Sequence, residues 1–495
     1  MNKLVAFITE RSGSLCRDLG ILSLTFGIIA FQMLWHFPLM EPDEGRYSEI
    51  PREMLEQMDF ITPTLNYVKY FEKPPLLYWM NSLSFAVFGQ NEFAARFPCA
   101  LCGLLTILVT YLIGRELFNR RVGVISAVMV GTSIGFLPMA RINLTDMPLT
   151  FCMTLSFGAF ILAVKDKGKR KSLYYYLFYA GAALAVLAKG LIGMLFPGAI
   201  IFLFLLLRKK WGLLKEMRLF TGIILFLLIA APWFILVSTK NPEFANFFFI
   251  HEHFDRFLTK VHDRYEPFWY FTPLLLGIML PWSVFIPSTL KRAWQNRNTE
   301  QAEALAWLAI WAIFIFLFFS KSNSKLPPYI LPVVPPLAVM IAYYFDSTAE
   351  RGGIFKGKFI AVASCIAVAI SIAASFIVYS IRSQTGTSKP LALKVVELAK
   401  PDDMIASFGY DQTLPFYTKR RIVVVGPMGE LEFGSKQGDN TDWFIDINKF
   451  SSVWESERVV YLSISLQLLS IAEKAWKSPP RVVVSTKDRA LVTNH

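Results

Sequence analysis

The stretch "LFTGIILFLLIAAPWFILVS" (residues 219–238) contains no charged side chain. A helix needs about 20 such residues to cross the hydrocarbon core of a bilayer, so this stretch predicts a transmembrane span. The segment before it, "RKKWGLLKEMR" (208–218), is rich in Lys and Arg, as connections on the cytoplasmic side of a membrane are. The two segments together predict a membrane helix with a defined orientation.

The rest of the chain repeats this pattern. Hydrophobic residues make up 54% of its 495 residues, more than a soluble globular protein contains, so a soluble fold is excluded. We expect eleven spans, and up to thirteen if two weaker runs are counted. The eleven lie at 19–37, 95–114, 122–140, 147–164, 173–188, 191–207, 219–238, 268–290, 304–320, 326–345 and 357–381.

Basic residues orient the spans. If the N-terminus lies inside, alternation puts the Lys- and Arg-rich connections 115–121, 165–171 and 208–218 on the cytoplasmic side, while 141–146 and 187–190 carry one basic residue each. The formal net charge of +13 is thereby assigned largely to loops that face the membrane. No motif points to a nucleic-acid partner, and we expect none.

Three segments interrupt the spans on the outer side: 39–94, 239–267 and everything after 381. The first segment predicts a short surface helix over 47–57 and an interfacial helix over 74–89. The chain divides into a membrane domain, 1–381, and a soluble outer α/β domain, 382–495. In the latter, helices are expected at 391–400 and 466–476, and strands at 420–426, 458–465 and 481–486.

Asp43 follows the first span directly, in "LMEPDEGRY". A carboxylate at the membrane boundary is costly unless it pairs or faces a polar cavity. One interpretation is a helix cap in a solvated loop. The other is a general base that takes a proton from an acceptor hydroxyl.

Cations and a phenol lie in the same outer segment. Arg46 and Lys73 carry permanent positive charge, and Tyr70 can hydrogen-bond phosphate oxygens, so the three suit a lipid-linked phosphate that becomes a leaving group. Lys73 taken alone also fits a side chain that reaches toward lipid headgroups or pairs with Glu72. The two prolines after Lys73 limit the freedom of the backbone, which favours one fixed orientation of Glu72 and Lys73.

The second outer segment contains "FFFIHEHFDRF" (247–257). Its ionisable side chains are His251, Glu252, His253, Asp255 and Arg256. Imidazole and carboxylate suit a divalent metal such as zinc. Because a full ligand set is not visible locally, a hydrogen-bonded surface is the competing interpretation, unless Glu72 comes close in space.

Two shorter outer connections add charge at span ends. Asp146 follows "RINLT", and Lys325 and Tyr329 lie in "SKLPPYILP" (324–332). Each fits a helix cap or an interface anchor as well as a functional group. Because these residues share one side of the membrane, a functional role is favoured over a purely structural one. The close pair Cys99 and Cys102 lies in a predicted span and fits small apolar residues rather than a redox or zinc site.

In this order, "EPDEGRYSEIPREML" (41–55), "YFEKPP" (70–75), "FFFIHEHFDRF" and "SKLPPYILP" resemble the membrane glycosyltransferases that use polyprenyl-phosphate sugars. The nearest likeness is to the bacterial aminoarabinose lipid A transferases, within a group that includes the dolichyl-phosphate-mannose protein mannosyltransferases. The resemblance implies a GT-C fold: a bundle of membrane helices, outer amphipathic helices and a periplasmic α/β domain.

The resemblance also implies roles for individual residues. Asp43 matches the catalytic carboxylate, and Asp146 a further acidic residue. The implied donor-phosphate contacts are Arg46, Tyr70, Lys73, Arg256, Lys325 and Tyr329. The implied metal contacts are Glu72 with His251 or, second, His253, so one divalent ion such as zinc is expected. No nucleotide is expected, because no Gly-rich phosphate loop is present.

The implied reaction is inverting sugar transfer from an undecaprenyl-phosphate donor to lipid A at the periplasmic side of the bacterial inner membrane, by a multi-pass protein expected to act as a monomer. A protein or another envelope glycan is the alternative acceptor. A transporter of lipid-linked sugars is the rival from another class. It predicts charges near mid-span, whereas the charges here cluster in outer loops.

Overall fold

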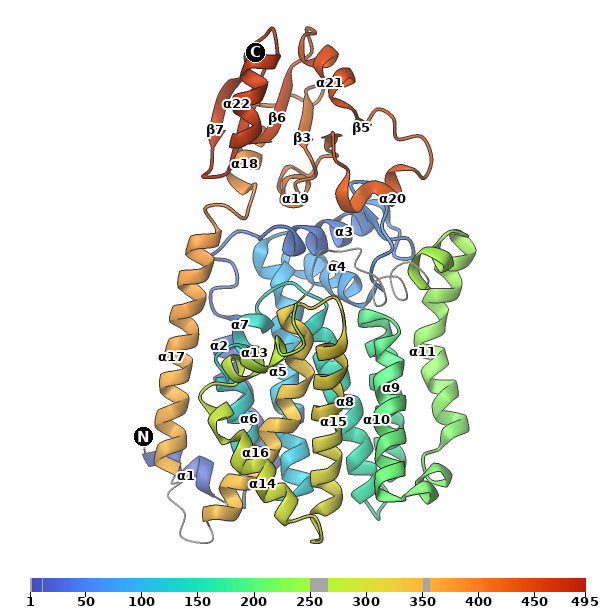
Figure 1. The fold of residues 1–495 in the computed structure, drawn as a ribbon, viewed down its shortest axis with the longest axis vertical. Helices are drawn as coiled ribbons and strands as arrows, with labels where there is room; N and C mark the ends of the chain where they lie inside the picture. The colour runs from blue at the N-terminus through green and yellow to red at the C-terminus, as the bar shows by residue number, and fades with distance from the viewer. Residues whose placement is uncertain (1, 11, 250–265, 350–356) are drawn as a thin grey trace. The chain divides into compact units, whose positions relative to one another are not determined.

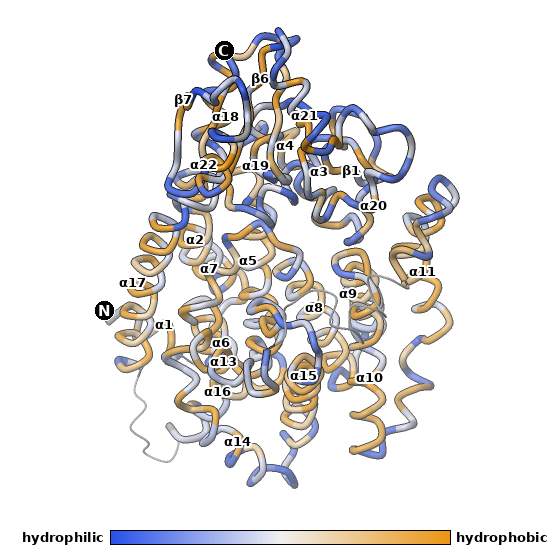
Figure 2. The backbone as a smooth tube through the Cα atoms, turned by 45° about the horizontal axis from the view of Figure 1, so that its top comes forward, coloured by the Kyte–Doolittle hydropathy of each residue, from blue (hydrophilic) through white to orange (hydrophobic). Residues whose placement is uncertain are grey.

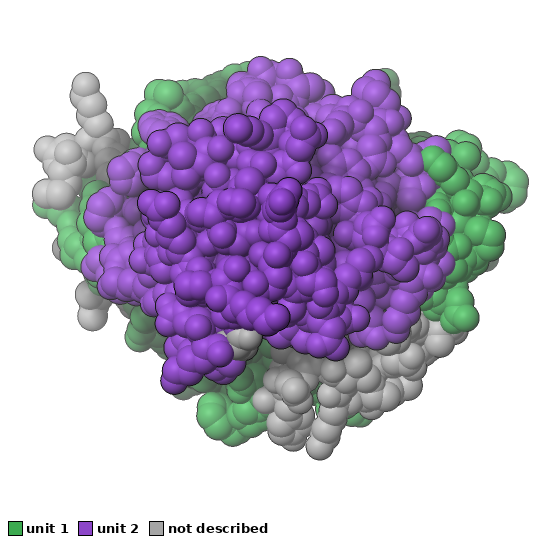
Figure 3. Space-filling view, turned by 90° about the horizontal axis from the view of Figure 1, so that it is seen from above, with its two compact units in different colours: residues 1–32, 72–76, 97–375 green, residues 33–71, 77–96, 376–495 purple. Residues whose placement is uncertain are grey.

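The computed structural model describes residues 2–10, 12–249, 266–349 and 357–495. It separates into two compact units, coloured in Figure 3. Unit 1 comprises residues 1–32, 72–76 and 97–375, and unit 2 comprises residues 33–71, 77–96 and 376–495. The chain therefore passes between the units several times, and unit 2 joins the first outer segment to the C-terminal region.

Unit 1 is helical, and Figure 2 shows hydrophobic residues along most of its helices. Within it, α9 contacts α8, α10 and α11. The helices before and within this group are α1 (Asn2–Thr9), α2 (Leu15–Phe31), α5 (Glu92–Leu117, from residue 97), α6 (Arg120–Thr132), α7 (Phe136–Ala140), α8 (Asp146–Lys165), α9 (Lys171–Lys189), α10 (Ile192–Arg208), η1 (Trp211–Lys215) and α11 (Leu219–Lys240). Those after it are α13 (Phe271–Ile278), η3 (Trp282–Phe285), α14 (Ile286–Gln295), α15 (Ala302–Lys321), η4 (Pro327–Val333), α16 (Val334–Ala349) and α17 (Gly357–Arg382, to residue 375).

The chain is a multi-pass membrane protein. Six described helical segments are long and apolar enough to cross a bilayer, or seven if the bent pair α13 with η3 and α14 counts as one. The sequence at 219–238 forms α11, as predicted, and only 22% of its most apolar window is buried within the protein. Such a helix needs lipid around it. The shorter α2, α6 and α10 overlap other predicted spans, so the total of eleven to thirteen stays a prediction.

Two predicted spans are not continuous helices. The run 122–140 breaks between α6 and α7, and the run 268–290 bends by 112° after α13. The two breaks face each other, because the backbone N–H groups of Ile134 and Gly135 donate to the carbonyls of Leu280 (3.1 Å) and Ile278 (3.0 Å). Backbone irregularity inside a membrane is tolerated where protein groups satisfy the exposed N–H and C=O groups. Each break therefore stabilises the other.

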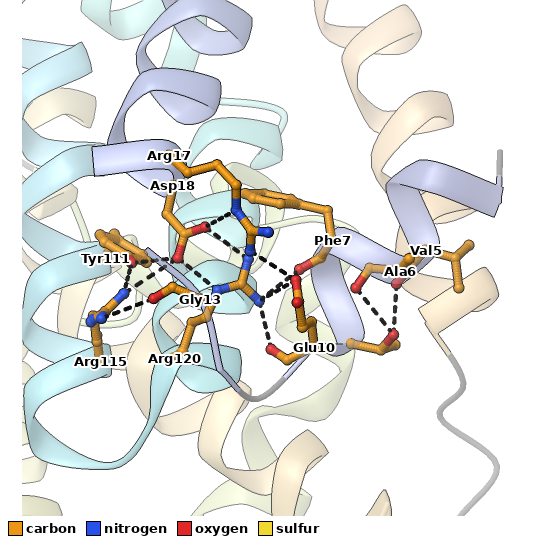
Figure 4. Close-up of polar contacts among 11 residues, drawn as sticks. Val5, Ala6, Phe7, Glu10, Gly13, Arg17, Asp18, Tyr111, Arg115 and Arg120 are labelled. Atoms are coloured by element: carbon orange, nitrogen blue, oxygen red, sulfur yellow. Dashed lines mark hydrogen bonds and ion pairs between the residues drawn. The ribbon is translucent and has the colours of Figure 1, made fainter. Parts of the chain in front are cut away.

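A buried polar cluster fixes the N-terminal end of unit 1 (Figure 4). The Asp18 carboxylate is completely buried and accepts from Arg120 Nε (2.6 Å) and Nη2 (2.8 Å), and from the Tyr111 hydroxyl (2.8 Å). Arg115 Nη1 lies 3.3 Å from the same carboxylate. Arg120 Nη1 also donates to the carbonyls of Phe7 and Glu10 at the end of α1. The cluster thus ties α1, α2, α5 and α6 together.

The outer segment of unit 2 contains α3 (Asp43–Gln57), a hairpin of β1 (Thr64–Leu65) and β2 (Val68–Lys69), and α4 (Leu76–Phe88). Helices were predicted at 47–57 and 74–89, so both are confirmed, and α3 starts four residues earlier. Instead of lying on a surface with one polar face, α3 is buried on all sides from Glu44 to Met54. Its charged side chains are accommodated by ion pairs.

The C-terminal region forms the predicted α/β fold around a six-stranded sheet of order β5-β4-β3-β6-β8-β7. The first four strands in this order are parallel, and β8 is antiparallel to both neighbours. The strands are β3 (Met404–Phe408), β4 (Val423–Val425), β5 (Phe444–Ile445), β6 (Val460–Ser465), β7 (Arg481–Ser485) and β8 (Arg489–Thr493). The helices are α18 (Lys389–Leu398), α19 (Thr413–Thr418), η5 (Gly429–Leu431), α20 (Glu432–Ser435), α21 (Ile447–Trp454) and α22 (Leu466–Ala475), labelled in part in Figure 1.

The five segments predicted in this region coincide with α18, α22, β4, β6 and β7, whereas the sequence analysis missed the other strands. Two apolar clusters hold the sheet. One includes Phe450, Trp454 and Leu462, and the other includes Leu391, Val395 and Leu491. Helices therefore cover the sheet with apolar residues, as in other layered α/β folds.

Candidate functional site

The first turn of α3 presents Asp43. This residue is the first of the helix, after Pro42 at the N-cap, and 45% of its side chain is exposed. The partial positive charge of a helix N-terminus favours a carboxylate at this position. Arg46, one turn along, places Nη1 3.7 Å from Asp43 Oδ1. The sequence-predicted base is therefore accessible and lies beside a predicted phosphate-binding cation.

Arg46 is held by a residue that the sequence analysis did not identify. Its Nε lies 2.6 Å from Glu430 Oε2, and both side chains are nearly buried. Tyr70, which follows β2, donates its hydroxyl to the same carboxylate oxygen at 3.3 Å, and the Arg46 guanidinium lies 6.0 Å from the centre of the Tyr70 ring. The predicted phosphate ligands Arg46 and Tyr70 thus meet at Glu430.

Glu430 belongs to the C-terminal sheet region, where Gln412 Nε2 donates to its other oxygen at 2.8 Å. The backbone of Gln412 packs against Gly45 of α3. A Cβ atom on Gly45 would lie 2.6 Å from the Gln412 carbonyl carbon, so only glycine fits. This close approach brings residues far apart in the sequence to the same end of α3.

The second half of α3 carries a separate buried carboxylate group. Arg52 pairs with both oxygens of Glu49 at 2.6 and 2.7 Å. Glu53 accepts from Thr64 Oγ1 (2.6 Å) and from the backbone N–H of Tyr67. Burial, together with the nearby Glu49 carboxylate, raises the pKa of Glu53 well above its usual value. This group braces the β1–β2 hairpin against α3.

Asp146 and Tyr329 come together in unit 1. Asp146 is the first residue of α8, is 7% exposed at its side chain, and pairs with Lys189 at the end of α9. Lys189 Nζ lies 4.1 Å from the centre of the Tyr329 ring in η4. Two predicted site residues from different loops are thus bridged by a lysine. In the sequence, Lys189 is the single basic residue of the predicted connection 187–190.

Lys325 and the Glu72–Lys73 pair also lie in unit 1. Lys325 is almost fully buried, and its Nζ donates to the carbonyls of Ser322 (2.6 Å) and Glu266 (2.7 Å). Burial lowers the pKa of Lys325. Lys73 Nζ donates to the Glu72 carbonyl at 2.8 Å. These lysines place positive charge on the connections that precede α4 and η4.

The predicted residues His251, His253 and Arg256 lie outside the described residues. Across the ranges that the structure describes, no three His, Cys, Asp or Glu side chains are grouped to hold a metal. Glu72, the remaining predicted metal contact, is described, but its predicted partners are not. Metal binding therefore stays a prediction.

Comparison with known proteins shows what this chain is similar to. A family model described as dolichyl-phosphate-mannose-protein mannosyltransferase matches residues 72–236. A second, described as the aminoarabinose transferase C-terminal domain, matches residues 391–494. A crystal structure of ArnT from Cupriavidus metallidurans bound to undecaprenyl phosphate is similar over 97% of this chain and 99% of that one, with a TM-score of 0.84 and 26% identity.

The chain is similar to the aminoarabinose transferases in its C-terminal sequence and over its whole fold. It is 34% identical over 322 residues to the undecaprenyl phosphate-alpha-4-amino-4-deoxy-L-arabinose arabinosyl transferase 2 of Pseudomonas fluorescens, an alignment that covers 64% of this chain and 57% of the relative. A relative in Proteus mirabilis is 31% identical, with 73% of this chain and 65% of the relative covered. The chain thus spans about three fifths of the length of these curated relatives.

The same fold extends to more distant proteins. The archaeal oligosaccharyltransferase AglB from Archaeoglobus fulgidus is similar over 93% of this chain, with a TM-score of 0.56 and 16% identity. That likeness concerns the fold alone. Of the residues described above, the region matched by the first family model contains Lys73, Asp146 and Lys189, and the region matched by the second contains Glu430.

Proposed function

We propose that this chain is an inverting glycosyltransferase that moves 4-amino-4-deoxy-L-arabinose from undecaprenyl phosphate to lipid A. The observation that carries the proposal is the likeness, over 97% of the chain, to a family member with undecaprenyl phosphate bound. The cluster of Asp43, Arg46 and Tyr70 supports it, because an accessible carboxylate lies beside groups that bind phosphate.

Each group then has a role in the displacement. An acceptor oxygen attacks the anomeric carbon, and its proton passes to the Asp43 carboxylate. The bond between the anomeric carbon and the phosphate oxygen breaks at the same time, with inversion. Undecaprenyl phosphate leaves with its negative charge stabilised by cations. Arg46, Tyr70, Lys73, Arg256, Lys325 and Tyr329 are the proposed phosphate contacts, and Asp146 with Lys189 orients Tyr329.

The reaction takes place on the outer side of the bacterial inner membrane, where residues 39–94 and 382–495 lie. The basic connections at 165–171 and 208–218 support this orientation, since such loops stay in the cytoplasm. A reporter enzyme that is active only in the periplasm, fused after residue 495, should be active. An inactive but stably produced fusion would overturn the orientation.

One divalent ion is proposed at Glu72 with His251 or His253, because imidazole and carboxylate suit zinc. Metal analysis of the purified protein should find about one equivalent per chain, and His251→Ala or Glu72→Ala should remove it. His251→Ala that retains the metal while His253→Ala loses it would move the site to His253. Metal retained in all three variants would refute the site.

Mass spectrometry of lipid A and envelope glycans tests the function as a whole. Cells with the gene should carry aminoarabinose on lipid A, and cells without it, or with Asp43→Asn, should not. The sugar on a protein or another glycan, with lipid A unchanged, would show the alternative acceptor. Donor that crosses the membrane without transfer would identify a transporter.

A further inference from the structure

The Arg96 guanidinium, near the start of α5, is 3% exposed and uses all five of its N–H donors. Nε and Nη2 donate to the two oxygens of Glu44 at 2.8 and 2.7 Å. The other three donors reach the carbonyls of Leu34 (2.8 Å), Phe37 (2.7 Å) and Pro38 (2.7 Å). A buried guanidinium with every donor satisfied is held in one orientation.

These acceptors belong to two consecutive pieces of chain. The three carbonyls lie in the segment that leads from α2 to α3, and Glu44 lies in the first turn of α3. Glu44 Oε2 also accepts from the Met40 backbone N–H at 3.0 Å. The Arg96 guanidinium also lies over the Tyr379 ring, 5.4 Å from its centre, which restricts its orientation further. One side chain therefore sets both where α3 begins and how its first turn is rotated.

Asp43 is the residue before Glu44. Successive side chains on a helix point about 100° apart, so a Glu44 held inward keeps the half-exposed Asp43 turned outward. A shift of about 1 Å in a catalytic group costs up to roughly 10²-fold in rate, so the accuracy of this placement matters for chemistry.

We propose that Arg96 and Glu44 are positioning residues that fix Asp43 at the acceptor. This inference rests on the proposed function. Because both side chains are buried, the pair acts through the backbone of the first turn of α3, so it governs turnover rather than donor affinity.

The same helix offers a matched control. Arg52 and Glu49 form a second two-pronged pair, equally buried, at 3% and 0% exposure. Arg96→Lys and Arg52→Lys each keep the positive charge and lose the planar fork, so the cost to folding should be similar. Glu44→Asp keeps the negative charge and shortens the side chain by one methylene, which gives an independent test if Arg96→Lys folds poorly.

The experiment measures kcat and KM for sugar transfer, binding of undecaprenyl phosphate, and thermal unfolding. We expect Arg96→Lys and Glu44→Asp to lower kcat by roughly 10–10²-fold, while undecaprenyl phosphate binding changes by less than about threefold. Arg52→Lys should leave kcat within about threefold at a similar loss of thermal stability. In an Asp43→Asn background, Arg96→Lys should cause no further loss, because the group that it positions has been changed.

Three results would overturn the inference: wild-type kcat in folded Arg96→Lys and Glu44→Asp, an equal loss of kcat in Arg52→Lys, or an undiminished effect of Arg96→Lys in the Asp43→Asn background. A failure of the proposed function would give a different result, seen already in the unaltered protein. If the unaltered protein neither binds undecaprenyl phosphate nor transfers sugar, the fault lies with the function and not with Arg96.

Discussion

Asp18, in the first turn of α2 in unit 1, and Asp43, the first residue of α3 in unit 2, have different surroundings. Asp18 is completely buried and accepts hydrogen bonds from Arg120 and Tyr111, as Figure 4 shows. Asp43 is 45% exposed, and its ion pair with Arg46 is long, at 3.7 Å. A carboxylate whose acceptor sites are filled stabilises the fold, whereas an accessible one can take a proton from a substrate.

Two buried arginines, Arg120 and Arg96, make the same kind of contact. Arg120 donates from Nε and Nη2 to the Asp18 carboxylate, and from Nη1 to the carbonyls of Phe7 and Glu10. Arg96 likewise donates from Nε and Nη2 to the Glu44 carboxylate, and its Nη1 donates to a carbonyl in the segment before α3. The difference is that the residue beside Glu44 is the accessible Asp43. The same kind of contact therefore stabilises the fold around Asp18 and, in our proposal, positions Asp43.

The largest expected effect is that of Asp43→Asn on turnover. The change keeps the shape and removes the basic oxygen, so sugar transfer should fall by about 10²–10⁴-fold, with thermal stability and undecaprenyl phosphate binding unchanged. Steady-state transfer from a polyprenyl-phosphate donor in vesicles checks this. Near-normal turnover would exclude Asp43 as the base and leave Asp146 as the next candidate.

Asp18→Asn should behave in the opposite way. It removes the buried counter-charge of Arg120 and leaves only the half-exposed Glu10 carboxylate, 3.8 Å away, which costs about 3–5 kcal/mol of stability. Thermal unfolding in detergent should show a marked drop, whereas turnover per folded molecule at a permissive temperature should stay close to normal. An unchanged unfolding temperature would mean that Asp18 is not the structural counterpart described above.

Lys73→Ala should weaken the donor complex. The leaving phosphate loses a charge-assisted contact worth about 1.5–3 kcal/mol, which is roughly a 10–150-fold rise in the dissociation constant of undecaprenyl phosphate. Lys436→Ala is the matched control, because Lys436 forms an exposed pair with Glu432 and should have no effect. Equal affinity in the two variants would remove Lys73 from the phosphate site.

The smallest effect is expected at Glu53, a buried carboxyl on the same helix as Asp43. Its pKa is raised in the folded state, so its contribution to stability is complete below the unfolded value of 4.5 and is lost as pH rises through the raised pKa. Glu53→Gln mimics the protonated form and should change the free energy of unfolding by about 1 kcal/mol or less, while removing that decline with pH. Unfolding followed from pH 5 upward measures this, and an identical pH dependence in both proteins would contradict it.

The sequence predicts the parts of this molecule that depend on local pattern. Apolar runs gave α8, α11 and α15, and runs of β-branched residues gave β4, β6 and β7. Asp43, Arg46 and Tyr70 were identified because they lie in one short outer segment. Glu430 was not identified, since 360 residues separate it from Tyr70 and it lies in the short 3-10 helix η5. The break near Ile134 was also missed, because its backbone partners are Ile278 and Leu280.

The proposed function is transfer of a sugar from a polyprenyl phosphate to lipid A. The most direct measurement incubates the purified protein in vesicles with undecaprenyl-phosphate aminoarabinose and lipid A, followed by mass spectrometry of both lipids. We predict that lipid A gains one aminoarabinose while an equal amount of undecaprenyl phosphate appears, and that Asp43→Asn abolishes both changes. Unmodified lipid A together with intact donor, from a protein that binds undecaprenyl phosphate, would contradict the account.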